Sequence, residues 1–207
     1  MTTINIQNVS KKYRIGNKEK YVLKDFTTLI NSDKCNFLIG YNGSGKSTLI
    51  KCVLNHVDYE GKIEVNANKI SYAPEKINLP DYSTVFDFLK TIARYKAIPY
   101  HLIDSVVEEY IEKFNLVEHK NKVIIKLSKG NRQKVNLIQA LLAESDIYIF
   151  DEPLSGLDDD TKEVFINEIK RLRRNSKLIV ISTHYIKDYR FRIKNIIRMG
   201  EVNESNT

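Results

Sequence analysis

The first third of the chain shows short runs of β-branched and aromatic residues, separated by Asn, Asp, Gly and Lys. Such runs are typical of strands, and the residues between them are typical of turns. A single helix is predicted in this part, at residues 47–56. The predicted strands cover residues 4–9, 22–30, 35–39, 62–65 and 70–73.

The middle third has the apolar spacing of helices. Residues 84–96 begin at a Ser-Thr pair and end before Pro99, as a capped helix does. A third helix is predicted at residues 128–143. Between these two helices, residues 101–114 place seven side chains on one face at helical spacing, namely Leu102, Ile103, Val106, Val107, Tyr110, Ile111 and Phe114.

The last third alternates between strands and a helix. Residues 147–150 form a short apolar run, which is typical of a fully buried strand. Residues 158–174 predict a helix with acids at its start and bases at its end, and residues 177–182 and 195–199 predict further strands. This order favours a mainly parallel sheet with right-handed crossovers. The whole pattern predicts an α/β core with an N-terminal antiparallel β lobe and an inserted helical lobe.

Composition adds limits to this picture. The 207 residues are 42% hydrophobic and 29% charged, and we expect one domain over residues 1–207 with the helical lobe at about residues 78–143. No apolar stretch of about eighteen residues is present, so the sequence predicts no transmembrane helix. The two cysteines, Cys35 and Cys52, lack metal-ligand spacing, which fits a reducing compartment.

The chain is basic, with a formal net charge of +7. Basic proteins often contact nucleic acid or an anionic membrane surface. No nucleic-acid motif with interleaved aromatic residues accompanies the charge, however. The densest basic run, residues 170–174, closes a predicted helix, where cations favour the negative end of the helix dipole. We interpret the charge as a solvated surface and expect no nucleic-acid partner.

Residues 40–47 match the phosphate-binding pattern G-x-x-x-x-G-K-S/T, directly between a predicted strand and a predicted helix. Glycines let successive backbone N–H groups face the phosphates, and the helix N-terminus adds positive potential. Lys46 is expected to reach the β- and γ-phosphates, and the Ser47 hydroxyl to bind Mg²⁺. The predicted ATP contacts in this segment and directly after it are Gly40, Tyr41, Asn42, Gly43, Ser44, Gly45, Lys46, Ser47 and Thr48.

Two acids, Asp151 and Glu152, directly follow the predicted buried strand 147–150. Parallel sheets place ligands at the carboxyl ends of their strands, so these acids are expected beside the phosphate-binding loop. Asp151 is then predicted to contact ATP and to hold the Mg²⁺ shell. Glu152 is predicted to face the water that attacks the γ-phosphate, since phosphoryl transfer needs mainly positioning and one base or orienting group.

Together with these motifs, Leu127-Ser128-Lys129-Gly130-Asn131 resembles the LSGGQ signature of the ATP-binding cassette (ABC) family. The resemblance extends over essentially the whole chain and implies a P-loop NTPase core. In that family the signature binds ATP held by the opposite subunit, so Ser128, Lys129, Gly130 and Asn131 are expected to act in trans. Lys129 replaces the first glycine of the motif, and Asn131 replaces the glutamine.

Further segments are similar to family elements. Residues 153–158 resemble the D-loop, which implies that Asp158 lies at the dimer interface. His184 follows a predicted strand, like the family's switch histidine, so the predicted catalytic residues are Glu152, His184 and Lys46. Tyr13 resembles the aromatic residue that stacks on adenine. Glu75 stands where the family has the Q-loop glutamine, and the resemblance implies that it contacts ATP and Mg²⁺-bound water.

The resemblance implies an ATPase subunit of an ABC transporter, with ATP as substrate and Mg²⁺ as cofactor. Its implied partners are a second ABC subunit, identical or related, and a transmembrane permease, and its implied place is the cytoplasmic side of the cell membrane. The Pro74-Glu75 pair is similar to bacterial exporter subunits, which favours export.

Three other interpretations stay open at this point. A soluble ABC ATPase that acts on ribosomes, DNA or protein complexes suits the basic charge. An unrelated P-loop GTPase or kinase would leave the signature-like segment unexplained, and no Asn-Lys-x-Asp guanine motif is present. A cassette that binds ATP without hydrolysing it conflicts with the presence of Lys46, Asp151, Glu152 and His184.

Overall fold

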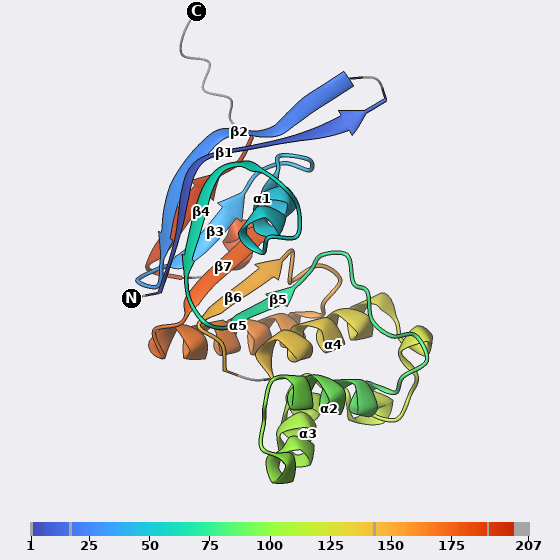
Figure 1. Cartoon of the computed structure of the whole chain (residues 1–207). Coiled ribbons are helices and arrows are strands. Elements are labelled where there is room, and N and C mark those ends of the chain that lie inside the picture. Colours follow the sequence, from blue (N-terminus) through green and yellow to red (C-terminus); the bar gives the residue numbers. More distant parts are fainter. Residues whose placement is uncertain (1, 17, 143, 190, 201–207) are drawn as a thin grey trace, which may run out of the picture.

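The structure is a computed structural model that describes residues 2–16, 18–142, 144–189 and 191–200. It has three parts: an antiparallel sheet, a parallel sheet with helices on both faces, and a pair of helices at the end far from the antiparallel sheet (Figure 1). These parts confirm the predicted α/β core, β lobe and helical lobe. Within the described residues, no helix is both long and apolar enough to cross a membrane.

The antiparallel sheet has the strand order β2-β1-β4. Its strands are β1 (Thr3–Ile15), β2 (Lys18–Asn31) and β4 (Glu60–Asn66). β1 and β2 are longer than predicted because they continue as a hairpin beyond the sheet, with Arg14 opposite Glu19. The polar residues of this hairpin carry no alternating apolar signal, so only the pairing of the two strands shows that they are extended.

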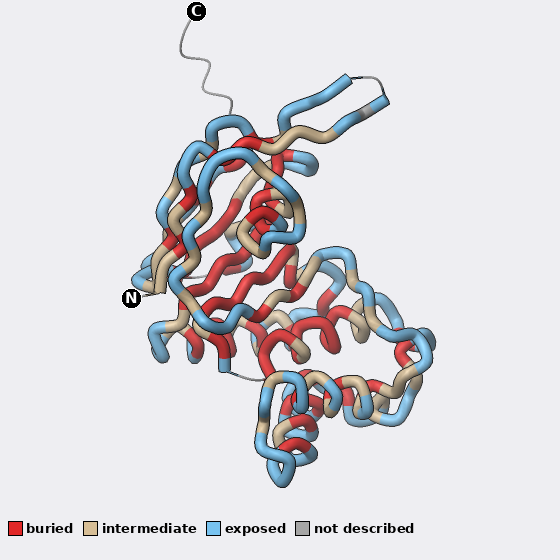
Figure 2. The backbone as a smooth tube through the Cα atoms, viewed as in Figure 1, coloured by how far each residue is buried: buried red, intermediate tan, exposed pale blue. Residues whose placement is uncertain are grey.

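The second sheet has the order β5-β6-β7-β3-β8, and all its neighbouring strands are parallel. Its strands are β3 (Cys35–Ile39), β5 (Ile70–Ala73), β6 (Ile147–Asp151), β7 (Leu178–Thr183) and β8 (Lys194–Arg198). β6 and β7 are buried along their whole length (Figure 2). This explains their continuous apolar sequences, because both faces of a parallel sheet are covered.

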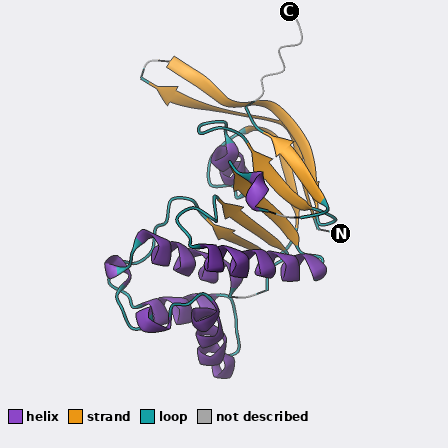
Figure 3. Ribbon diagram, turned by 180° about the vertical axis from the view of Figure 1, so that it is seen from behind, coloured by secondary structure: helices purple, strands orange, loops and turns teal. Residues whose placement is uncertain are grey.

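Helices cover the two faces of the parallel sheet. α1 (Lys46–Val53) and the antiparallel sheet lie on one face, while α4 (Lys129–Leu141) and α5 (Asp159–Arg174) lie on the other (Figure 3). Side chains of β6 alternate accordingly: Ile149 belongs to the apolar cluster around α1, and Phe150 to the cluster around α4 and α5. The loop that leaves the carboxyl end of each strand therefore emerges at one common edge.

The helical lobe lies between β5 and β6 in the sequence. It contains α2 (Val85–Tyr95), capped by the Thr84 side chain as predicted, and α3 (Ile103–Lys113). Five of the seven side chains predicted to share one face are buried: Ile103, Val107, Tyr110, Ile111 and Phe114. The prediction is wrong for Leu102, which is 42% exposed, because Tyr100–Leu102 forms a 3₁₀ turn with a different side-chain period.

The other predicted helices agree with the structure to within a few residues. α1 ends three residues earlier than predicted, near Asn55, whose positive φ of 55° is typical of a helix C-terminus. Asp158, predicted as the first residue of α5, is its N-cap. The predicted end of the third helix at Ala143 lies outside the described residues.

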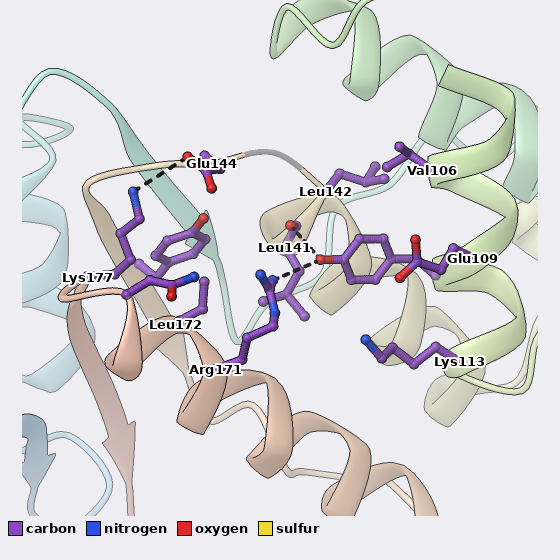
Figure 4. A pocket seen from close by; sticks show the side chains of 12 residues that line it. Val106, Glu109, Lys113, Leu141, Leu142, Glu144, Arg171, Leu172 and Lys177 are labelled. Carbon is purple, nitrogen blue, oxygen red and sulfur yellow. Dashed lines mark hydrogen bonds and ion pairs between the residues drawn. The ribbon is translucent and has the colours of Figure 1, made fainter. Parts of the chain in front are cut away.

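Polar contacts join the helical lobe to the core beside a cavity of about 290 Å³ between α3 and α5 (Figure 4). The Tyr110 hydroxyl donates to the Leu141 carbonyl at 3.1 Å and accepts from Arg171 at 3.3 Å. Glu168, only 3% exposed, forms ion pairs with Arg171 at 2.9 Å and with Lys113 of the lobe at 2.6 Å. These contacts attach α3 to α5.

Candidate functional site

The loop from β3 to α1 has the backbone of a phosphate-binding loop. Gly43 and Gly45 have φ values of 84° and 97°, a region that side chains with a Cβ rarely adopt. Gly45 is the N-cap of α1 and no side chain caps this helix, so its first N–H groups keep free hydrogen-bonding capacity. Gly40 has a different constraint, because a Cβ there would lie 2.6 Å from the Met199 carbonyl oxygen.

A cavity of about 250 Å³ opens in front of this loop. It is bordered by segments far apart in the sequence: Tyr13 on β1, Glu75 after β5, Glu152 after β6 and His184 after β7. The complete lining is Tyr13, Val22, Asn42, Gly43, Ser44, Gly45, Lys46, Ser47, Thr48, Glu75, Glu152 and His184. The structure thus brings most of the predicted ATP-site residues to one cavity.

Lys46, Glu152 and His184 form the centre of the cavity. Nε2 of His184 lies 3.0 Å from Oε1 of Glu152 and 3.5 Å from Nζ of Lys46, while Lys46 Nζ lies 3.8 Å from the same Glu152 oxygen. Lys46 also donates to the carbonyls of Gly40 and Tyr41, at 2.8 and 3.3 Å. The three side chains meet because β6, β7 and β3 are neighbours in the sheet.

Glu152 combines burial with backbone strain. Burial raises the pKa of its carboxyl, while the nearby His184 and Lys46 act in the opposite direction. Its φ of 48° lies in the left-handed region, which is costly for a residue with a side chain. Ser182 holds this conformation, since its carbonyl and hydroxyl accept from the Glu152 N–H at 3.2 and 3.1 Å. A strained, partly buried acid in a cavity is typical of a functional site.

Asp151, predicted to contact ATP and Mg²⁺, does not line the cavity in this structure. It is 2% exposed and accepts a short hydrogen bond from the Ser182 hydroxyl. Tyr41 and Gly40 do not line the cavity either, and the Tyr41 side chain is 65% exposed. Their part in the site lies in the backbone carbonyls that hold Lys46.

The oxygen atoms of Ser47, Asp151 and Glu75 suit Mg²⁺, which prefers hard oxygen ligands. In the described part of the chain, no group of three or more His, Cys, Asp or Glu side chains forms a metal cage. Mg²⁺ in phosphate-transfer sites usually takes one or two protein ligands together with phosphate oxygens and water, and the side chains of Ser47, Asp151 and Glu75 could supply such ligands.

Comparison with known proteins identifies the family to which this site belongs. The family model described as "ABC transporter" matches residues 23–155 of the chain. The chain belongs to the ABC transporter family. It is an ABC ATPase, and it corresponds to the ATP-binding subunit of an ABC transporter.

Two relatives illustrate the similarity. An uncharacterized ABC transporter ATP-binding protein of Methanocaldococcus jannaschii, MJ1023, is 31% identical over 185 residues, which cover 89% of this chain and 69% of that protein. A probable metal transport system ATP-binding protein of Thermotoga maritima is 31% identical over 186 residues, covering 87% of this chain and 74% of that protein.

A solved ABC cassette, MJ0796, is similar over nearly its full length. In its dimeric structure, described as a bacterial ABC transporter cassette, it is 25% identical, with a TM-score of 0.87 over 97% of this chain and 96% of that one. A second dimeric structure of the same cassette, in a post-hydrolysis state bound to ADP and Pi, gives a TM-score of 0.85. The fold of this chain is therefore that of an ABC cassette.

The signature-like residues of the cassette lie outside its own cavity. Ser128 caps α4 by accepting from the Asn131 N–H at 3.2 Å, and Ser128 and Lys129 are exposed. Gly130 is constrained, because a Cβ there would lie 2.7 Å from the carbonyl oxygen of Gly156 in the D-loop-like segment. This contact gives a steric reason for glycine at position 130.

Asp158, predicted at a dimer interface, contacts residues of its own chain in this structure. Its side chain caps α5 by accepting from the Thr161 N–H at 2.8 Å and pairs with Lys134 at 3.0 Å. These hydrogen bonds hold the pKa of the Asp158 carboxyl well below its usual range. The contact links α4, which begins at the signature, to the segment that follows Glu152.

Sequence reasoning missed several residues of the site. Val22 lines the cavity from β2, and Ser182 holds both Asp151 and Glu152. Gln133 and Asn136 are buried polar residues on α4. Ser182 carries a sequence signal, since it directly precedes Thr183 and His184, whereas the other three show none until the tertiary contacts are known.

Proposed function

We propose that residues 1–207 act as one cassette that binds Mg²⁺-ATP in the cavity at the start of α1 and hydrolyses it there. The observation that carries this proposal is the contact of Lys46, Glu152 and His184, all within 4 Å of one another, in front of uncapped helix N–H groups. Positive potential at this end of α1 favours the phosphates. In this proposal Tyr13, which lines the same cavity, stacks on adenine.

In this proposal each side chain acts on the γ-phosphate or on the attacking water. Lys46 exchanges its backbone carbonyl partners for phosphate oxygens. Glu152 orients the water and accepts its proton as the water oxygen attacks the γ-phosphorus, while the bond to ADP breaks. His184 holds Glu152 and the phosphate in place. Mg²⁺, held with Ser47, Asp151 and Glu75, neutralises phosphate charge when it is bound.

We further propose that two cassettes enclose the nucleotide, with Ser128, Lys129, Gly130 and Asn131 of one facing the ATP of the other. The position of these residues outside their own cavity supports this arrangement, as do the dimeric structures of the related cassette. Asp158 then lies at the interface. Closure is favoured by ATP to the extent that the closed pair makes additional contacts with it.

We also propose that the cassette works on the cytoplasmic side of a membrane with a transmembrane permease, without nucleic acid, and that it supports export. The relatives named above are transporter ATP-binding proteins, which supports the permease. Export rests on the resemblance of the Pro74-Glu75 pair to exporter subunits. The second cassette in this proposal is an identical or a related subunit.

The test is Glu152→Gln, with Glu163→Gln as the matched control because Glu163 is exposed on α5. Loss of the orienting carboxylate is expected to lower the hydrolysis rate at least about 100-fold, with ATP affinity retained. The control should keep the wild-type rate. Sustained turnover by Glu152→Gln would refute the assignment of Glu152.

The same variant tests the partners. Glu152→Gln, tagged and extracted with ATP from membranes of its own host, is expected to recover a polytopic membrane protein in a fixed ratio. Recovery of only ribosomes, nucleic acid or soluble proteins would refute the proposed permease partner.

A further inference from the structure

Helix α4 carries two amide side chains into the protein interior. Gln133 is 3% exposed and Asn136 is 1% exposed, and they lie three residues apart on the same face of the helix. Burying an amide is costly unless its donors and acceptors are bonded. The partners of these two side chains therefore indicate why polar residues occupy this face.

Their hydrogen bonds form a continuous chain. Nδ2 of Asn136 donates to the carbonyl of Pro74 at 2.9 Å and to Oε1 of Gln133 at 3.3 Å. Nε2 of Gln133 donates to the carbonyl of Pro153 at 2.8 Å. One orientation of each amide satisfies all three bonds, since each nitrogen donates and the oxygen of Gln133 accepts.

Both ends of this chain lie next to an acid of the ATP cavity. Pro74 directly precedes Glu75, and Pro153 directly follows Glu152. Glu75 and Glu152 both line that cavity, although they follow different strands of the sheet. The two amides of α4 thus connect the backbone beside Glu75 to the backbone beside Glu152.

The same helix begins at the signature-like residues. Ser128 is its N-cap, and Gln133 lies within the second turn. One residue further, Lys134 pairs with Asp158 at 3.0 Å. Because an α-helix moves as a rigid rod over this length, displacement of its first turn displaces both buried amides.

We propose that Gln133 and Asn136 are positioning residues that keep Glu75 and Glu152 in register with the signature end of α4. This inference rests on the proposed roles of Glu75 and Glu152. A buried, hydrogen-bonded amide network resists distortion, and misplacement of reacting groups by about 1 Å can lower a rate on the order of 100-fold. When the signature-like residues contact the nucleotide of a second cassette, the same position of α4 then aligns Glu75 and Glu152 in the chain's own cavity.

The test compares Asn136→Ala and Gln133→Leu with Gln139→Ala. Gln139 is a matched control, because its Nε2 donates at 2.8 Å from the same helix to the carbonyl of Tyr72, which lies within β5 and beside neither acid. Gln133→Leu fills the space of the amide without its donor. If the space left by Asn136→Ala prevents folding, Gln133→Leu still tests the proposal.

For Asn136→Ala and Gln133→Leu we expect kcat to fall on the order of tenfold or more. The Kd for ATP, measured by nucleotide titration, should stay within twofold. Gln139→Ala should lower the unfolding midpoint by a similar amount and keep kcat within twofold. Unchanged kcat in Asn136→Ala and Gln133→Leu would overturn the proposal. An equal loss of kcat in Gln139→Ala would also overturn it, because the effect would then reflect stability.

A double-mutant cycle separates action through Glu75 from general damage. If Asn136 acts through Glu75, then adding Asn136→Ala to Glu75→Ala lowers kcat by less than twofold. If Asn136→Ala lowers kcat in the Glu75→Ala background by as much as it does in the wild type, Asn136 does not act through Glu75. If the wild-type chain itself hydrolyses no ATP, the proposed function is refuted, and the positioning role of Gln133 and Asn136 is refuted with it. If the wild type hydrolyses ATP and the variants keep its kcat, only the positioning role is refuted.

Discussion

Lys96 places a partly buried ammonium group where the helical lobe joins the core. It follows the last turn of α2, and its Nζ donates to the Ser71 hydroxyl at 2.7 Å and to the Ala140 carbonyl at 3.0 Å. No carboxylate lies within ion-pair distance of it in the described residues. Burial lowers the pKa of the Lys96 side chain from its ordinary 10.5 to about 8.

This pKa makes stability depend on pH in a defined direction. A depressed lysine pKa means that the unfolded chain binds the proton more tightly, so stability rises with pH between 8 and 10.5. The difference between the two values, 10.5 − 8 = 2.5, corresponds to at most about 3 kcal/mol, because one pKa unit is about 1.4 kcal/mol. The cost is complete below pH 8 and disappears above pH 10.5.

Replacing Lys96 with Met keeps the apolar stem and removes the titrating group. We expect the free energy of unfolding of Lys96→Met, relative to wild type, to fall by about 2 kcal/mol between pH 7 and pH 9.5, since the wild type loses most of its penalty there. Urea unfolding at several pH values measures this difference. Titrations shared by both proteins cancel in it.

Lys126→Met is the control for loss of a positive charge, because Lys126 is exposed. Its difference from wild type should not change with pH in this window. If the difference for Lys96→Met is equally flat, within about 0.5 kcal/mol, then Lys96 stays protonated in the folded protein and the argument from burial is wrong.

Three further predictions follow from single contacts. Gly130→Ala should destabilise the chain by about 1–3 kcal/mol in urea unfolding, because its Cβ meets the Gly156 carbonyl oxygen at 2.7 Å; an unaltered midpoint would show that the two segments separate freely. If the Tyr13 ring stacks on adenine, Tyr13→Ser should weaken ATP binding about tenfold in a nucleotide titration, and Tyr13→Phe should not. Equal ATP affinities of the two variants would refute the stacking role of Tyr13. Lys113→Met should cost about 1–2 kcal/mol of unfolding free energy, less than a fully buried pair, because Glu168 keeps a guanidinium partner; no loss would mean that this ion pair does not attach the lobe.

The elements of the fold were predictable because their signals are local. The continuous apolar run of β6, the Thr84 cap of α2 and the acid-to-base gradient of α5 each depend on neighbouring residues. Leu102 was misassigned for the same reason, since helical spacing alone does not distinguish a 3₁₀ turn from the helix that follows. The outer part of the β1–β2 hairpin had no apolar alternation to detect.

The site was predictable where chemistry requires a fixed local sequence. The phosphate-binding loop needs glycines at given positions for its backbone, followed by lysine and serine, so residues 40–47 identified it. Asp151 and Glu152 were placed by the rule that ligands gather at the carboxyl ends of parallel strands. The orientation of Asp151 was not predictable, because its carboxylate is directed by a hydrogen bond from Ser182, a residue of another strand.

The sequence by itself determined the strands, the helices and the motifs of this ABC cassette, because each depends on side-chain period and backbone chemistry within a few residues. Only the tertiary structure decided that β3, β6 and β7 are neighbours, which brings Lys46, Glu152 and His184 together. It also decided that Gln133 and Asn136 bond to the backbone beside two distant acids. The physical reason is that strand order and buried hydrogen bonds are selected by packing between segments far apart in the chain, and a one-dimensional pattern does not contain those distances.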